Sequence, residues 1–285
     1  MRVAPLVAEL DAYFRVPDVR GDFAFVEAVY PPYWRELVEP AYIERWNGLM
    51  VRGRPNVERV VTCVFPSDEI VASLEPETLL FAEHPIDLED EPGFLPLSRE
   101  SLERLRETAS GFYHVHGPLD QHPEIAPSRL VAEALGLAEL EEFCPIVEGL
   151  SGGAIVAGAS ALSLDALADR LAAKLGPEVP VRVVSRPRPE AGKVAVAAGG
   201  GAGVEFLRPA LERGCQTYVT GNAITDCRLD FVRDEVRAFR ELADAEGVAV
   251  IDGTHYGLEK PPQVAMVEWF RQQGVPAEFR AVGPK

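Results

Sequence analysis

Histidine and carboxylate side chains that could bind metal ions follow several short apolar segments of the chain. His84 comes almost directly after TLLFA, and His255 follows VAVID, with Glu259 four residues later. His116 ends the segment GFYHVH, and Asp120 lies four residues beyond it. Neutral imidazole and ionised carboxylate are common ligands of zinc, iron and manganese. Two metal ions held close together need several carboxylates to offset their charge. Two-metal sites of this kind serve hydrolysis. These residue types therefore indicate a metal site.

The apolar segments in front of these residues have the length and composition of β-strands, and helix-like segments alternate with them. Such alternation predicts a parallel or mixed sheet with helices on its faces. The carboxyl ends of parallel strands meet at one edge, where open α/β sheets bind ligands. A lone histidine is most often a hydrogen-bonded structural residue. The chain has only five histidines, and their common placement after strands favours a site.

His255 and Glu259 lie just before a pair of prolines. Lys260 precedes Pro261, and a residue before proline disfavours helical geometry, whereas proline suits the opening of a helix. We therefore expect His255 in a loop and Glu259 at or just before the N-terminus of a helix that begins at Pro261. A charge stabilised by the helix dipole is an alternative explanation for Glu259.

Other kinds of site fit the sequence less well. GGGAG (199–203) follows a predicted strand, but it lacks the full spacing of a phosphate loop and favours a tight strand-to-helix turn. His114 and His116 form the HxH pattern of amidohydrolase barrels, which need two more histidines on later strands, and only His255 suits. A zinc deaminase would need a ProCys-x-x-Cys element. The four cysteines show no CxxC spacing, which favours small buried residues.

The predicted strands and helices indicate an α/β fold with two parts. Ser67 precedes the helix-like SDEIVASL, and SLDALADRLAAKLG has a serine cap and a glycine stop. The proline-rich VSRPRPEAG (184–192) is the best candidate for a boundary. We therefore expect an N-terminal part at 1–186 and a C-terminal part at 187–285, both within one compact unit.

The 285-residue chain carries a formal net charge of −17. Such an acidic surface repels nucleic acid and anionic membranes, so we expect neither as a partner. No segment approaches the ~20 apolar residues of a membrane span. The N-terminus lacks the apolar core of a signal peptide, which predicts a cytoplasmic protein. A phosphate-bearing substrate would need local cations, and bound metal ions are the obvious source.

Four segments match, in order, the motifs of one known family. They are Trp46-Asn47-Gly48-Leu49, Glu83-His84-Pro85, His116-Gly117-Pro118-Leu119-Asp120 and Asp252-Gly253-Thr254-His255-Tyr256-Gly257-Leu258-Glu259. They are similar to Trp-Asp-Asn-x-Gly-Leu, His-His-Pro, His-Thr-x-Leu-Asp and Gly-His-Tyr-x-x-Glu. Over roughly residues 40–275 the chain thus resembles the NIF-three-like proteins, also described as GTP cyclohydrolase type-two homologues.

The resemblance implies two related α/β halves with mixed or mainly parallel sheets, a dinuclear metal site between them, and a toroidal homohexamer. It places metal ligands at His84, Asp120, His255 and Glu259, and it places His116 in the pocket beside the metals. The expected cofactor is two divalent ions, and zinc, manganese, iron and magnesium all remain open as its identity.

The chain departs from the family at three positions. Glu83 stands where a ligand histidine is usual, so its carboxylate could bind one ion or bridge two; alternatively, Glu83 points to solvent. Asn222 and Asp226 stand where the family often has an acid and a following histidine. These changes leave both the metal and the family's nominal activity open.

Two functions follow as hypotheses. The first is a metal-dependent hydrolase of a nucleotide or another phosphorylated small molecule, similar to the GTP cyclohydrolase type-two homologues. His116 would then be the catalytic proton shuttle, because imidazole exchanges protons near neutral pH. The alternative is a non-catalytic metal-binding hexamer with a regulatory or scaffold role. Function depends on the site rather than the fold, and the sequence shows no clear pocket for a base.

Overall fold

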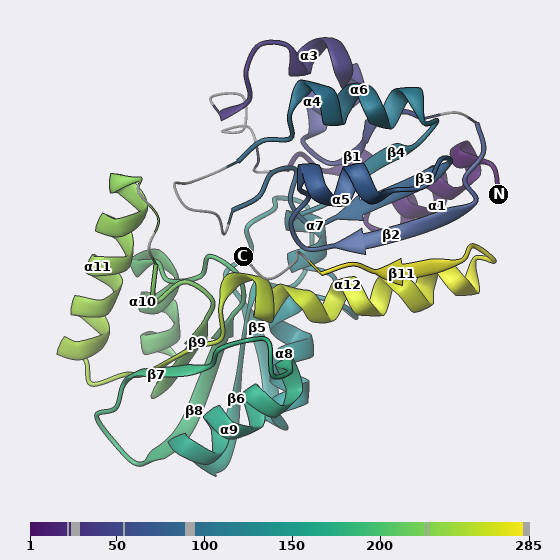
Figure 1. Ribbon diagram of the computed structural model, residues 1–285. Helices are drawn as coiled ribbons and strands as arrows, with labels where there is room; N and C mark the ends of the chain where they lie inside the picture. Colours follow the sequence, from purple (N-terminus) through teal and green to yellow (C-terminus); the bar gives the residue numbers. More distant parts are fainter. Residues whose placement is uncertain are drawn as a thin grey trace.

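Two β-sheets form the framework of the molecule, and helices cover them (Figure 1). The computed structural model describes residues 1–21, 23, 29–53, 55–88, 95–225, 227 and 229–281. Both sheets contain parallel and antiparallel pairs. The predicted α/β class with two mixed sheets is therefore confirmed.

The first sheet has the strand order β1-β4-β3-β2-β11. Its strands are β1 (Gly48–Val51), β2 (Arg59–Cys63), β3 (Thr78–Ala82), β4 (Gly111–His114) and β11 (Ala277–Phe279). Helix α5 (Asp68–Ser73) connects β2 to β3, and α6 (Arg99–Glu107) connects β3 to β4. All neighbours are parallel except β1, which runs antiparallel to β4. The carboxyl ends of β3 and β4 therefore lie side by side.

The second sheet has the order β5-β6-β8-β9-β10-β7. Its strands are β5 (Ala138–Phe143), β6 (Ile155–Ser163), β7 (Arg182–Ser185), β8 (Glu190–Ala197), β9 (Thr217–Thr220) and β10 (Ala249–Asp252). Its helices are α9 (Leu164–Leu175), α10 (Val204–Glu212) and α11 (Asp230–Ala245). The central strands β8, β9 and β10 are parallel, so their carboxyl ends form a second common edge.

The chain passes from the first sheet to the second through α7 (Gly117–Asp120) and α8 (Pro127–Leu135). It returns through α12 (His255–Gln272), which leads into β11. Figure 1 shows α12 (yellow) lying between the two sheets. The expected boundary at 186/187 falls between β7 and β8, two strands of the second sheet. The division between the sheets comes earlier, between β4 and β5.

Short polar side chains start the helices as the sequence predicts. The Ser67 hydroxyl accepts a hydrogen bond from the Ile70 N–H at 3.2 Å, and Ser163 accepts one from Ala166 at the same distance. These bonds satisfy N–H groups that the first turn of a helix leaves without a partner. Both serines therefore fix where a helix follows its strand.

Alternating strand residues pack on opposite faces of each sheet. In β3, for example, Leu79 and Leu80 belong to different buried clusters, as the two-residue period of a strand requires. The N-terminal elements α1 (Val3–Tyr13), η1 (Val16–Asp18), α3 (Trp34–Leu37) and α4 (Pro40–Arg45) supply apolar side chains to both clusters of the first sheet. In the described ranges, we find no helix with the length and apolarity that crossing a bilayer requires.

Candidate metal centre

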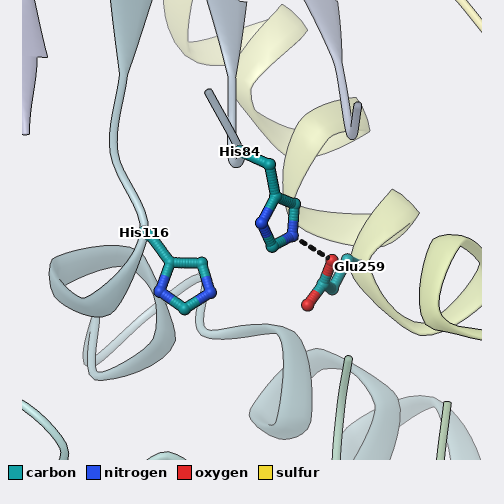
Figure 2. A group of neighbouring side chains, drawn as sticks. All are labelled: His84, His116 and Glu259. Carbon is teal, nitrogen blue, oxygen red and sulfur yellow. Dashed lines mark hydrogen bonds and ion pairs between the residues drawn. The ribbon is translucent and has the colours of Figure 1, made fainter. Parts of the chain in front are cut away.

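Three imidazole and carboxylate side chains from distant parts of the sequence converge between the sheets. His84 lies two residues beyond the end of β3, and His116 lies two residues beyond β4. Glu259 comes from the second turn of α12, whose first residue follows β10 by three positions. Figure 2 shows the three side chains pointing toward one another. Each offers a ligand atom within 4.8 Å of the others, a spacing that suits a shared metal ion.

Glu259 is the centre of a hydrogen-bonded group. Its Oε2 lies 2.7 Å from Nε2 of His84, and its Oε1 lies 2.9 Å from Nε2 of His255. Burial of the carboxyl opposes ionisation, but the two histidines outweigh it and hold the pKa of Glu259 well below its usual value. An ionised carboxylate only accepts hydrogen bonds, so both Nε2 atoms donate to it.

His84 consequently has one nitrogen available for a further ligand. Burial, partly offset by the nearby Glu259, lowers the pKa of His84 to about 4, so the ring is neutral at physiological pH. Since Nε2 carries the proton, Nδ1 presents a lone pair, and this buried atom has no hydrogen-bond partner among the described residues. Neutral imidazole is a common ligand of transition metals. The donor set therefore fits a divalent ion.

His116 and Asp120 form the side of the site next to the first sheet. Nδ1 of His116 lies 3.4 Å from Oδ2 of Asp120. The Asn47 side-chain oxygen accepts a hydrogen bond from the backbone N–H of His116 at 2.9 Å. The Phe23 ring packs against the His116 ring with their centroids 4.5 Å apart. These contacts fix both the backbone and the ring of His116.

Glu83 is fully buried, so the alternative that it points to solvent is wrong. Its Oε2 accepts a hydrogen bond from Nε2 of Gln263 at 3.1 Å. Burial and the charges of Glu259 and Asp120 raise the pKa of the Glu83 carboxyl well above its usual value. The charges of two further carboxyl groups thus act on Glu83, and divalent cations would relieve this repulsion.

The predicted start of the last helix is wrong. Helix α12 begins at His255 rather than at Pro261, so His255 and Glu259 both lie on it, one turn apart. Thr254 caps the helix, because its hydroxyl accepts a hydrogen bond from the Gly257 N–H at 2.9 Å. Pro261 and Pro262 lie inside the helix. The helical spacing of four residues is what brings Nε2 of His255 to Glu259.

The glycine-rich segment is a strand-to-helix turn, as predicted. It runs from the end of β8 to α10, and Gly199 has a φ of +64°. A Cβ atom at Gly199 would lie 1.9 Å from Oε1 of Glu259, so only glycine lets the turn pass this close. Oδ1 of Asn222 accepts a hydrogen bond from the Ala202 N–H at 2.8 Å, which holds the turn in place. Asp226 lies outside the described residues.

A pocket of about 580 Å³ opens beside these side chains. The five polar residues described above, His84, His116, Asp120, His255 and Glu259, line it. Its other lining residues include the apolar Phe23, Leu88, Ile146, Ile155, Phe206, Phe231 and Val232. The volume suits a small organic molecule, and apolar walls with a few convergent polar groups are typical of a ligand site.

Some residues that shape the site were not expected from the sequence. Asn47 and Gln263 contribute through hydrogen bonds, and Phe65 packs against the rings of both His84 and His255. Conversely, His114 and His122 serve other contacts. Nδ1 of His114 pairs with the Tyr42 hydroxyl at 3.0 Å, and Nδ1 of His122 accepts hydrogen bonds from the backbone of Glu124 and Ile125.

Residues 32–281 match the sequence profile of the family described as Duf34/NIF3 (NGG1p interacting factor 3). A GTP cyclohydrolase 1 type 2 homolog of Yersinia pestis is 27% identical over 80% of this chain and 85% of its own. The homolog of Deinococcus radiodurans is 30% identical over 75% of each chain.

Solved structures show the same fold. The protein ybgI, described as of unknown function, aligns with a TM-score of 0.69 at 20% identity, and the alignment covers 100% of this chain and 99% of ybgI. A Bacillus cereus protein related to NIF3 aligns with a TM-score of 0.62 at 14% identity, over 100% and 97% of the two chains.

Proposed function

Because the chain belongs to the Duf34/NIF3 family, we propose that it is a metal-dependent hydrolase that holds two divalent ions between its sheets. The proposed ligands are Glu83, His84, Asp120, His255 and Glu259. The observation that carries the proposal is the buried, unpartnered Nδ1 of His84, whose ring the ionised Glu259 holds through Nε2. The charges of Glu259 and Asp120 that act on the buried Glu83 support a second ion.

We propose a nucleotide or another phosphorylated small molecule as the substrate. Divalent ions would supply Lewis acidity and the positive charge that a phosphate group needs. The aromatic rings of Phe23, Phe206 and Phe231 line the same pocket, and flat aromatic surfaces suit the stacking of a heterocyclic ring. The names of the curated relatives, GTP cyclohydrolase 1 type 2 homologs, agree with this class of substrate.

His116 would move the proton during hydrolysis. The contact of its Nδ1 with Asp120 orients the ring, and the ring lines the pocket together with His84, Asp120, His255 and Glu259. An imidazole can take up and release protons near neutral pH. The apolar residues around it would limit the access of bulk water. We place this activity in the cytoplasm and in a hexamer, as the family resemblance and the sequence suggest.

The metal assignment is tested by elemental analysis of purified protein. We expect two divalent ions per chain, and we expect His255→Ala and Asp120→Ala each to lose metal while keeping the far-UV circular dichroism of the wild type. Asp169→Ala, an exposed position on α9, serves as the control and should keep both ions. Full metal content in both ligand variants would show that the site is assigned incorrectly.

The hydrolase assignment is tested by screening nucleotides and phosphoesters with and without added divalent metal. We expect turnover that requires metal and that falls about 10²–10⁴-fold in His116→Ala, the usual contribution of general acid–base catalysis. His122→Ala, which alters a histidine outside the site, should keep its activity. The absence of metal-dependent turnover on every compound would favour a regulatory or scaffold protein instead.

A further inference from the structure

One face of α12 carries three polar side chains, His255, Glu259 and Gln263, at successive intervals of four residues. This spacing places them above one another on the helix. Two consecutive residues after β3 meet this face. His84 bonds Glu259, with 2.7 Å between Nε2 and Oε2, and Glu83 bonds Gln263, with 3.1 Å between Oε2 and Nε2. The first contact belongs to the proposed metal site, and the second joins that site to Gln263.

The contact between Glu83 and Gln263 is fully buried, and each side chain has 0% relative exposure. In this contact the amide nitrogen of Gln263 donates and Oε2 of Glu83 accepts, an orientation that the hydrogen-bond network assigns to the amide. The second oxygen of Glu83, Oε1, is buried without a hydrogen-bond partner among the described residues. Leaving such an oxygen unsatisfied is costly unless a positive group meets it. The free oxygen therefore indicates a place for a cation.

Gln263 is itself held in place. Its backbone carbonyl accepts a hydrogen bond from the Thr62 hydroxyl of β2 at 2.9 Å, while its side chain bonds Glu83 next to β3. Helix α12 is thus fixed to the first sheet at the residue that holds Glu83. A donor anchored in this way can set the direction of the carboxylate, because rotation of Glu83 would break the hydrogen bond.

We propose that Gln263 is a positioning residue that holds Glu83 as the oxygen ligand of one of the two ions. Glu83 stands where the family usually has a histidine, so an oxygen ligand replaces a nitrogen ligand at this position. Carboxylate ligands favour manganese and magnesium relative to zinc. The inference rests on the proposed metal binding, although it does not require that the protein hydrolyses anything.

The test measures metal binding and needs no activity. Metal-stripped wild type and Gln263→Leu are titrated calorimetrically with Mn²⁺ and with Zn²⁺. We expect Gln263→Leu to bind one equivalent about ten- to a hundred-fold more weakly, as loss of a group that supports a ligand does. The loss should be larger for Mn²⁺, and the other equivalent should keep its affinity. Gln272→Leu, exposed on the same helix, should match the wild type.

A double-mutant cycle then separates positioning from general damage. If Gln263 acts through Glu83, Gln263→Leu should change nothing further in a Glu83→Ala background. Additive effects of the two changes would overturn the proposal, as would unchanged affinities in Gln263→Leu. If the circular dichroism of Gln263→Leu shows that this variant does not fold, Gln263→Met is used instead. The same weakening of one metal equivalent is expected for it.

The outcome for the wild type distinguishes this inference from the proposed function. A wild type that binds no metal overturns both. A wild type that binds two ions, together with Gln263 variants that bind them equally well, overturns only the role of Gln263.

Discussion

Glu259 sets the protonation of the imidazoles around it. Because it is ionised and only accepts hydrogen bonds, it fixes the proton of His84 and of His255 on Nε2. The remaining nitrogen of His84 then points away from Glu259 with its lone pair free. One carboxylate thus prepares a neighbouring ring to bind a cation before any ion arrives. This preparation depends on burial, since exposed side chains would exchange their partners with water.

A third carboxyl group that lines the pocket, that of Glu235 on α11, has an unusual pKa. Its pKa is raised from 4.5 to about 7, first by burial and then by the hydrogen bond with Glu205 and the charge of that residue. Between these values the folded protein binds more protons than the unfolded chain, so its stability should fall as the pH rises from about 4.5 to 7. We expect Glu235→Gln to reduce the fall in melting temperature between pH 5 and pH 8.

The control for this prediction is Glu241→Gln, an exposed position on the same helix, which should keep the pH dependence of the wild type. The effect should be small, because solvent screens a carboxyl near the surface. The same fall in melting temperature in wild type and Glu235→Gln between the two pH values would show that the pKa of Glu235 is not raised.

Among the elements, the turn after β8 controls how close the second sheet comes to Glu259. Gly199→Ala would place a methyl group where Oε1 of Glu259 now lies, and Gly214→Ala would meet nothing within 4 Å. Both glycines have positive φ, +64° and +73°, so both changes should cost ~1–2 kcal/mol of backbone strain. Only Gly199→Ala should also lose metal, as measured by elemental analysis. Equal metal content in the two variants would argue against Glu259 as a ligand.

Elements with strong local signals could be predicted from the sequence. Strand β3 has the predicted bounds, and the helices after Ser67 and Ser163 begin where their caps place them. The start of α12 could not be predicted, because Pro261 argues locally against a helix through Lys260. Proline inside a helix costs ~3 kcal/mol. The Thr254 cap stabilises the helix locally. The burial of Leu258 and Glu259 is a tertiary contribution, and both oppose this cost.

The site could be predicted only in part for a similar reason. The residue types and their positions after strands were enough to select His84, His116 and Glu259, which the structure brings together. The sequence gave no reason to select Asn47 and Gln263 as site residues, because amide side chains occur in many structural roles. Their partners, His116 and Glu83, lie 69 and 180 residues away in the sequence. Only the fold reveals such pairs.

At the scale of the whole molecule, the chain ties its two sheets together twice. It leaves the first sheet after β4, builds the second sheet, and returns through α12 to place β11 beside β2. Four residues of the candidate site lie along these two crossings: His116 and Asp120 at the first, His255 and Glu259 at the second. A change in the relative position of the sheets would therefore change the distances between the proposed ligands.

The last prediction concerns assembly. The family resemblance implies a homohexamer, and each chain carries a formal net charge of −17, so six copies would repel one another strongly. Added salt screens this repulsion, because at 0.15 M ionic strength charges more than about 8 Å apart interact only weakly. We therefore expect sedimentation velocity to show six times the chain mass at moderate or high salt, with dissociation favoured at low salt. Bound divalent ions should act in the same direction, because they offset part of the charge. If ion pairs between copies held the hexamer instead, salt would dissociate it, and a monomer at every salt concentration would exclude the hexamer.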